Sequence, residues 1–137
     1  MPSKRTLYKD DWLVSDFTLE EIKTLKATNR MTQRNQHLNG VFDKMTFEEI
    51  IELQLKLNEE CPMNKFKPFP TGLYVETKMV VFYREMGIEI SQLIHDVLVK
   101  YNIETVEKAN NKLPIIIESF EEESLIYFQD VLKSDLP

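Results

Sequence analysis

A carboxylate and an amine lie close together near the end of segment 71–78, which reads Thr-Gly-Leu-Tyr-Val-Glu-Thr-Lys. Side chains of a strand alternate between its two faces, so Glu76 and Lys78 share one face and lie about 6.5 Å apart along the strand. The leucine and valine of the segment point to the other face. An acid and a base held this close could bind a metal ion and a phosphate oxygen, or could form a plain surface ion pair.

Two helices are expected before this strand, each opened by a capping box. Thr18 with Glu21, and Thr46 with Glu49, have the spacing at which two side chains bond the free backbone amides of the first helical turn. The second helix is expected to run to about Leu57. The first helix is expected to face a core with its apolar residues: Leu19, Ile22 and Leu25.

The segments around the first helix have less regular patterns. Residues 12–17 are mostly apolar and predict a short strand or an extended entry into the helix. Residues 30–43 are polar, contain an Asn-Gly pair and show no periodicity, so we expect a long loop. Loops of this length in a compact domain are usually functional or disordered. Arg30 and Arg34 could reach an anionic ligand from this loop, although solvated arginines are the more common case.

The segments on either side of the strand at 71–78 also have readable patterns. Residues 63–70 predict an irregular connection into it, and residues 79–87 fit either an extension of the strand or an apolar loop. Residues 90–101 repeat apolar side chains at helical spacing and predict an amphipathic helix. His95 lies beside that apolar stripe, and a single helical histidine is more often a surface residue than a metal ligand.

A second strand is expected at residues 115–117, three isoleucines that follow a proline. Such a continuous β-branched run is typical of a strand that is buried on both faces. Ser119 is expected to cap the following helix, with glutamates 121–123 in its positive first turn. The apolar face of this last helix is formed by Leu125, Phe128, Val131 and Leu132.

The alternation of helices and strands predicts an α/β fold, with parallel strands joined by crossover helices. Functional residues in such folds gather at the carboxyl ends of the strands. Glu76 and Lys78 stand at the end of the first strand, and Glu118 and Ser119 stand at the end of the second. The sequence therefore indicates one candidate metal or phosphate site at this edge of the sheet.

Composition limits the kinds of protein this chain can be. Its 137 residues are 42% hydrophobic with only three glycines, as in a globular domain. The net charge of −6, without a cluster of basic residues, argues against nucleic acid as a main partner. Cys61 is the single cysteine and cannot form an internal disulfide. No apolar run approaches the ~20 residues of a membrane span, so we expect no such span.

From about Asp11 onward, short motifs follow one another in a specific order. They are Asp-Phe-Thr-Leu-Glu-Glu-Ile-Lys-Thr-Leu-Lys at 16–26, Asn-Gly at 39–40, Thr-Phe-Glu-Glu-Ile at 46–50, Tyr-Val-Glu-Thr-Lys at 74–78, Phe-Tyr at 82–83, Gly-Ile at 87–88, Ile-Glu-Ser-Phe at 117–120 and Lys-Ser-Asp-Leu-Pro at 133–137. In this order and spacing they resemble the middle of glycerophosphodiester phosphodiesterases.

The resemblance implies an enzyme that hydrolyses glycerophosphodiesters to glycerol 3-phosphate and an alcohol, with a bound divalent cation, Ca²⁺ or Mg²⁺. It implies that Glu76 is a metal ligand and that Lys78 contacts the substrate phosphate. The His-Arg pair, the Glu-x-Asp motif and the second histidine of the family are absent from this chain, since His37 and His95 stand at other positions. A glutamine is common in the family where Glu118 stands.

Two further residues depart from the pattern of the family. Thr77 stands where the family often has a branched apolar residue, and the proline that often follows soon after Lys78 is missing.

The family implies an eight-stranded TIM (β/α)8 barrel, which needs about 250 residues. Residues 1–137 are therefore interpreted as one incomplete glycerophosphodiester phosphodiesterase domain, a partial barrel of roughly half the full size. We expect this piece to be inactive alone; the alternative is a catalytically inactive binding or interaction fragment. Open sheet edges would favour self-association. A cytoplasmic location is expected if Met1 is the true start, and a secreted or periplasmic-type location stays open for a longer enzyme.

Overall fold

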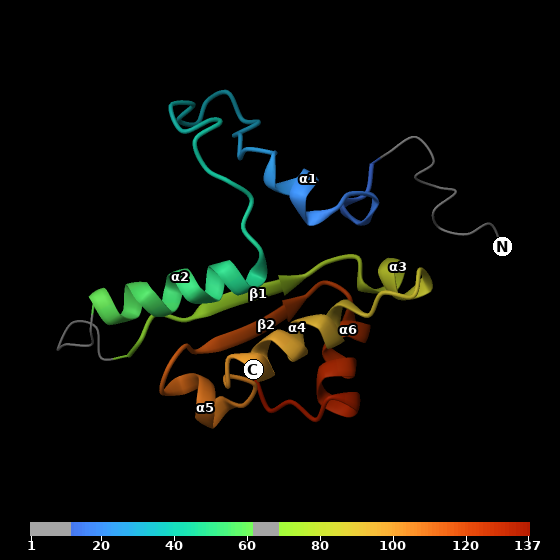
Figure 1. Ribbon diagram of the computed structural model, residues 1–137. Helices are drawn as coiled ribbons and strands as arrows, with labels where there is room; N and C mark the ends of the chain where they lie inside the picture. The colour runs from blue at the N-terminus through green and yellow to red at the C-terminus, as the bar shows by residue number, and fades with distance from the viewer. Residues whose placement is uncertain (1–11, 62–68) are drawn as a thin grey trace. The chain divides into compact units, whose positions relative to one another are not determined.

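The computed structural model describes residues 12–61 and 69–137, which belong to two compact units divided after Thr46 (Figure 1). The irregular connection predicted at residues 63–70 lies almost wholly outside the described residues. In the described part of the chain, every helix is too short or too polar to cross a membrane.

The first unit contains a short 3-10 helix, Val14–Asp16, and helix α1, Leu19–Lys23. The short strand or extended entry predicted at residues 12–17 is therefore wrong at 14–16, whereas Leu13 and Phe17 on either side are extended. The backbone N–H of Leu13 donates to the carboxylate of Asp16 over 3.0 Å, and such a local bond to an aspartate competes with extended structure. The capping box of α1 is confirmed: the Thr18 amide donates to Glu21 over 2.8 Å, and the Glu21 amide donates to the Thr18 hydroxyl over 3.3 Å.

Helix α1 does not present the expected apolar face. Leu19 and Leu25 are 57% and 51% exposed. The helix ends at Lys23, so Leu25 lies outside it, and a helix of five residues is too short to carry a continuous stripe.

The long polar loop predicted at residues 30–43 is confirmed, because this segment contains neither helix nor strand. An antiparallel bridge and an ion pair between Lys26 and Asp43 close its two ends. Gly40 adopts a φ of 77°, which a residue with a side chain rarely tolerates, and completes the turn after Asn39.

The second unit begins with α2, which runs from Phe47 directly after Thr46 and ends at Glu60, three residues beyond the predicted end. Asn58 near the end of α2 holds the start of the first strand through two bonds: its amide donates to the Thr71 carbonyl over 2.9 Å, and its oxygen accepts from the Thr71 amide over 3.0 Å. The remaining elements follow in the order β1 Leu73–Thr77, α3 Val80–Glu85, α4 Ile90–Lys100, α5 Val106–Asn110, β2 Ile115–Ser119, α6 Glu122–Ile126 and a π-helical turn Tyr127–Val131.

Strands β1 and β2 pair in parallel, as predicted, and lie side by side in Figure 1. The chain between them contains α3, α4 and α5, so the crossover is helical. Gly72 enters the sheet where a Cβ atom would collide with the carbonyl of Pro114, and the Leu73 amide donates to that carbonyl over 2.8 Å. These two strands form a two-stranded sheet in the described residues, and the half-barrel stays a prediction.

The core lies on one face of this sheet. Ile115 and Ile117 of β2 pack with Leu98 of the predicted helix at 90–101, and Phe128 of the last helical segment joins the same cluster. On the other face Ile116 is 42% exposed. The prediction that this strand is buried on both faces is therefore wrong, because the core cluster of the second unit covers one face.

Segment 79–87 contains a helix, α3, at Val80–Glu85, instead of the predicted strand extension or loop. Met79 adopts a left-handed conformation with φ 56°, which ends the strand direction after Lys78. Val80 and Phe82 of this short helix are buried.

Two further apolar residues, which belong to the apolar repeat of residues 90–101 and to the apolar face of the last helix, are exposed. Leu93 in α4 is 56% exposed, and Val131 in the last helical turn is 59% exposed.

Candidate functional site

Glu76 and Glu118 are register partners at the carboxyl ends of the two parallel strands. Paired residues of adjacent strands lie about 4.8 Å apart and their side chains point to the same face, so the two carboxylates are neighbours. The ammonium group of Lys78 forms an ion pair with Glu76. Two carboxylates and one amine therefore meet at the strand ends, where the sequence predicted a site.

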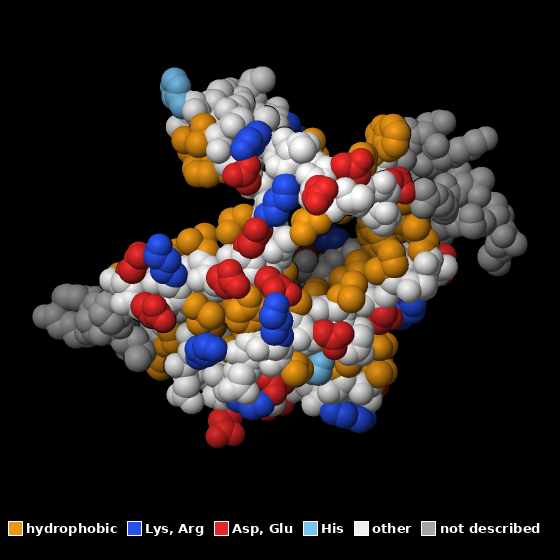
Figure 2. All heavy atoms as spheres, viewed as in Figure 1, with side chains coloured by type: hydrophobic (Ala, Val, Ile, Leu, Met, Phe, Trp, Pro, Cys, Tyr) orange, Lys and Arg blue, Asp and Glu red, His pale blue; other side chains and the backbone are white. Residues whose placement is uncertain are grey.

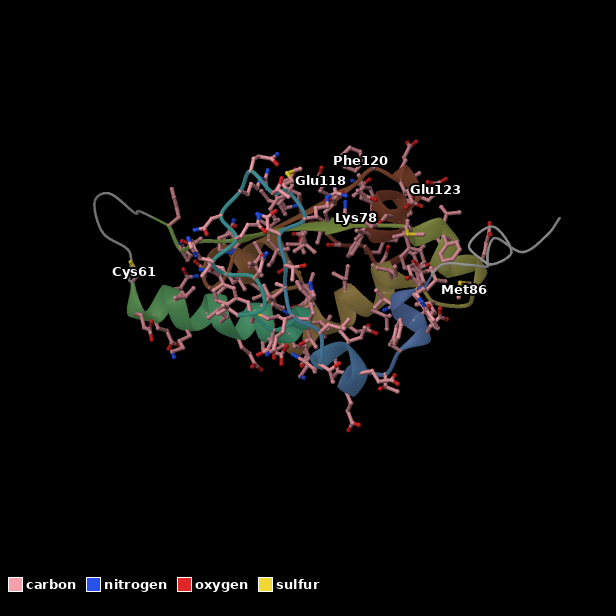
Figure 3. All side chains as sticks on the ribbon, turned by 90° about the horizontal axis from the view of Figure 1, so that it is seen from above. Cys61, Lys78, Met86, Glu118, Phe120 and Glu123 are labelled. Atoms are coloured by element: carbon pink, nitrogen blue, oxygen red, sulfur yellow. The ribbon has the colours of Figure 1, made fainter. Side chains whose placement is uncertain are left out.

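Phe120 adds an aromatic ring to this group, which the sequence interpretation did not identify as a site residue. The Lys78 ammonium lies 6.0 Å from the centre of the Phe120 ring, a cation–π distance. Figure 3 shows Lys78, Glu118 and Phe120 together at this end of the sheet. Phe120 is 86% exposed, so its ring is accessible to a ligand. The only sequence signal was its place directly after the second strand.

A chain of three buried hydroxyl groups fixes the end of β1 from the core side. The Thr77 hydroxyl donates to the Glu118 carbonyl over 3.3 Å and lies 2.9 Å from the Ser124 hydroxyl, which lies 3.1 Å from that of Ser91. One direction satisfies all of these contacts, with Ser91 donating to Ser124 and Ser124 donating to Thr77. Since all three side chains are buried, these bonds tie β1 to α6 and α4.

Glu121 organises the chain that follows Lys78. Its two carboxylate oxygens accept from the backbone amides of Val80 and Val81, each over 3.0 Å, and so cap the start of α3. The predicted cap Ser119 acts differently: its hydroxyl accepts from the Glu121 amide over 3.0 Å within the turn, and Glu121 is the residue before α6. The prediction that Ser119 caps the last helix is therefore wrong.

The two histidines are far from the strand ends in the sequence. His37 is exposed in the loop of the first unit, where its backbone amide donates to the Asn35 side chain over 2.8 Å. His95 lies on α4 and is half-buried. Its Nδ1 atom is shielded from solvent, so the prediction of a surface side chain is wrong for this nitrogen. Hydrogen bonding from Lys108 lowers the pKa of the nearby Glu104, and the charge of His95 contributes in the same direction.

A divalent cation is the cofactor that the family resemblance implies. Among the described residues, no group of three or more His, Cys, Asp and Glu side chains is arranged to hold a metal ion. Mg²⁺ often binds proteins through one or two carboxylates and keeps several waters, whereas Ca²⁺ takes 6–8 oxygen ligands. Glu76 and Glu118 therefore fit a part of such a ligand set, and further oxygen ligands would have to complete it.

The comparison with known proteins agrees with the motif order. No family model matches the chain. Over 126 residues, 87% of its length, the chain is 32% identical to the glycerophosphodiester phosphodiesterase GDPD6 of Arabidopsis thaliana. By this match the chain is a homologue of one part of a glycerophosphodiester phosphodiesterase. The match covers 31% of the Arabidopsis protein, so the chain spans about a third of the length of this phosphodiesterase relative.

Proposed function

We propose that this chain supplies one part of a glycerophosphodiester phosphodiesterase active site, with Glu76 as a metal ligand and Lys78 as a phosphate contact. The observation that carries this proposal is the meeting of Glu76, Glu118 and Lys78 at the carboxyl ends of two parallel strands. In parallel α/β folds this edge is where catalytic and binding residues gather.

The two carboxylates and the amine would have different roles in such a site. A Ca²⁺ or Mg²⁺ ion, when bound, supplies a Lewis acid that polarises a phosphoryl oxygen. Lys78 is 68% exposed and its ammonium can turn from Glu76 towards an anionic substrate. The ion pair then holds Lys78 in reach of the strand end before substrate arrives.

Glu118 sets the electrostatic condition for binding a phosphodiester. Two neighbouring carboxylates repel an anion, and a single lysine offsets only one of them. A divalent cation bound between the carboxylates would offset their negative charge and allow an anion to bind. The substrate is therefore expected to bind only together with the metal.

The missing motifs support the second candidate function, a catalytically inactive binding or interaction fragment. The chain lacks the His-Arg pair, the Glu-x-Asp motif and the second histidine that the family resemblance calls for. General acid–base hydrolysis needs a group that can donate a proton to the leaving alcohol. We propose that the chain alone does not hydrolyse glycerophosphodiesters.

A chimera separates the two functions. In it, this chain replaces the matching segment of the Arabidopsis relative, and the hydrolysis of glycerophosphocholine with Ca²⁺ or Mg²⁺ is measured. Turnover by the chimera, and none by the chain alone, supports the proposed active-site role. A folded but inactive chimera favours the inactive fragment, and turnover by the isolated chain would show that the missing motifs are not required.

Two substitutions in the chimera test the role of the strand end. Glu76→Gln is expected to lower kcat/KM by at least about tenfold and to weaken the dependence on the cation, because it removes a charged ligand. Glu59→Gln removes an exposed carboxylate from α2 and serves as the matched control. Equal activity of the two variants would refute the ligand assignment.

A further inference from the structure

The loop of the first unit forms an open cavity that shares no residue with the strand-end site. The cavity has a volume of about 550 Å³, and the described residues that line it all belong to segment 27–42. This volume lies within the range of about 300–1,000 Å³ that is typical of small-molecule sites. Its polar lining includes Arg34, Asn29 and Asn35, and its apolar lining includes Leu38 and Phe42.

Side-chain bonds to the backbone hold the cavity wall in place. The oxygen of Asn39 accepts from the Asn29 amide over 2.7 Å, and the Asn39 amide group donates to the Gln36 side chain over 2.7 Å. Gln36 in turn donates to the carbonyls of Met31 and Arg34, each over 2.8 Å. The backbone that carries Arg34 is therefore fixed before any ligand binds.

The hydrogen bonds within the loop use the side-chain oxygens of two lining asparagines as acceptors and do not use their NH₂ donors. The side-chain oxygen of Asn29 accepts from the Met31 amide over 3.1 Å, and that of Asn35 accepts from the His37 amide over 2.8 Å. No bond from the NH₂ groups of these two asparagines, or from the guanidinium of Arg34, to another described residue is found. Arginine has five N–H donors and no acceptor, so the unbonded groups of these three side chains are donors.

We propose that this cavity binds a phosphate-bearing ligand. Arg34 would form charge-assisted bonds to the phosphate oxygens, for which its planar donor fork is well suited, and the two amide groups would donate to the remaining oxygens. Leu38 and Phe42 are 52% and 57% exposed and offer an apolar surface for the organic part of the ligand. This site uses none of the strand-end residues and does not require catalysis.

Phosphate binding is measured on the whole chain by isothermal titration calorimetry, with inorganic phosphate and glycerophosphocholine as probes. Arg34→Gln is expected to weaken binding at least about tenfold, because it removes charge-assisted bonds. Arg30→Gln is the matched control: it removes the same charge from the same loop but from a residue outside the cavity lining. An equal loss in both variants, or no loss in Arg34→Gln, would overturn the proposal.

A second variant keeps the hydrogen bonds of the loop and replaces one hydrogen-bond donor of the cavity with an acceptor. Asn35→Asp retains the oxygen that accepts from the His37 amide but replaces the NH₂ donor with a negative oxygen. It is expected to abolish phosphate binding with an unchanged circular dichroism spectrum. Undiminished phosphate binding by a folded Asn35→Asp protein would contradict the proposal.

Vesicle sedimentation distinguishes the source of the phosphate. Phosphatidylcholine vesicles with and without phosphatidic acid are compared with the two soluble probes. Binding to phosphatidic acid vesicles that is lost in Arg34→Gln supports a lipid headgroup, and binding only to the soluble probes supports a free phosphate ester. Absence of binding to every probe would overturn the site itself. The strand-end variant Glu76→Gln is expected to bind phosphate in this cavity normally, so failure of one proposal does not imply failure of the other.

Discussion

The hydroxyl of Tyr101 donates to Glu52 over 2.6 Å and thereby joins the end of α4 to α2. One residue earlier, Lys100 forms an ion pair with Glu48 over 2.5 Å. Figure 2 shows acidic and basic side chains side by side over this part of the surface. Beneath them Ile51 of α2 is fully buried in the core cluster. The contact between the two helices thus has an apolar centre and a charged rim.

The Tyr101–Glu52 bond predicts a loss of stability at high pH. The bond raises the pKa of Tyr101 from 10.0 to about 12, because it stabilises the protonated phenol beside a carboxylate. A group with a raised pKa contributes stability below its unfolded value, and this contribution is lost as the pH rises from about 10 to about 12. Urea unfolding between pH 9 and pH 12 should show this decline in the native protein and less of it in Tyr101→Phe. Tyr74→Phe, at an exposed strand position, should leave the decline unchanged.

The buried hydroxyl chain predicts that Thr77→Val is destabilising although valine has nearly the same shape. The valine leaves the Ser124 hydroxyl without its acceptor in the core, and such an unpaired buried group costs about 1–3 kcal/mol. Ser91→Ala removes only the donor at the end of the chain and should cost less, about 1 kcal/mol. Denaturant unfolding of both variants checks the order. A Thr77→Val protein as stable as the native one would show that the three hydroxyl groups act independently.

Thr77 also shows how far the sequence could be interpreted. The parallel pairing of its strand β1 with β2 was predicted from the order of elements. The bonds from Ser124 and Ser91 could not be predicted, because they join residues 47 and 33 positions apart in sequence. Long-range contacts of this type depend on packing that periodicity does not encode.

The helices, too, were predicted where their signals are local in sequence and missed where the signals are distant. The capping box of Thr18 depends on residues three apart and was predicted correctly, whereas α3 was missed because its cap is Glu121, about forty positions away. An apolar segment such as 80–83 fits a strand and a helix equally well until that distant carboxylate is known. The candidate site shows the same limit. Glu76 and Lys78 were predicted from the pattern of a single strand, whereas Phe120 could be assigned to the site only once the pairing of the two strands was known.

The cap formed by Glu121 predicts a local effect on α3. In Glu121→Ala the backbone amides of Val80 and Val81 lose their acceptor, so the first turn of α3 should fray, at a cost of about 1 kcal/mol typical of lost caps. Hydrogen exchange at these two amides should become faster, while exchange at the core amide of Ile117 changes less. Glu122→Ala, which removes a neighbouring carboxylate from the first turn of α6, is the control. Unchanged protection of Val80 in the Glu121 variant would contradict the capping role.

The open side of the sheet predicts self-association of the isolated chain. Ile116 and Tyr74 are 42% and 66% exposed on the face away from the core. The Leu73 amide donates towards β2, so by alternation the amide of Tyr74 points away from it and can donate to an added strand. Exposed strand edges and apolar patches are sites of pairing between chains.

Sedimentation should therefore show a concentration-dependent shift from monomer to oligomer. Ile116→Lys places a charge on the exposed face without touching the core residues on either side of it, and should move the equilibrium towards monomer. Leu93→Lys removes an apolar side chain of similar exposure from α4 and should have a smaller effect. A native chain that stays monomeric and melts in one sharp transition would show that the exposed face does not drive association.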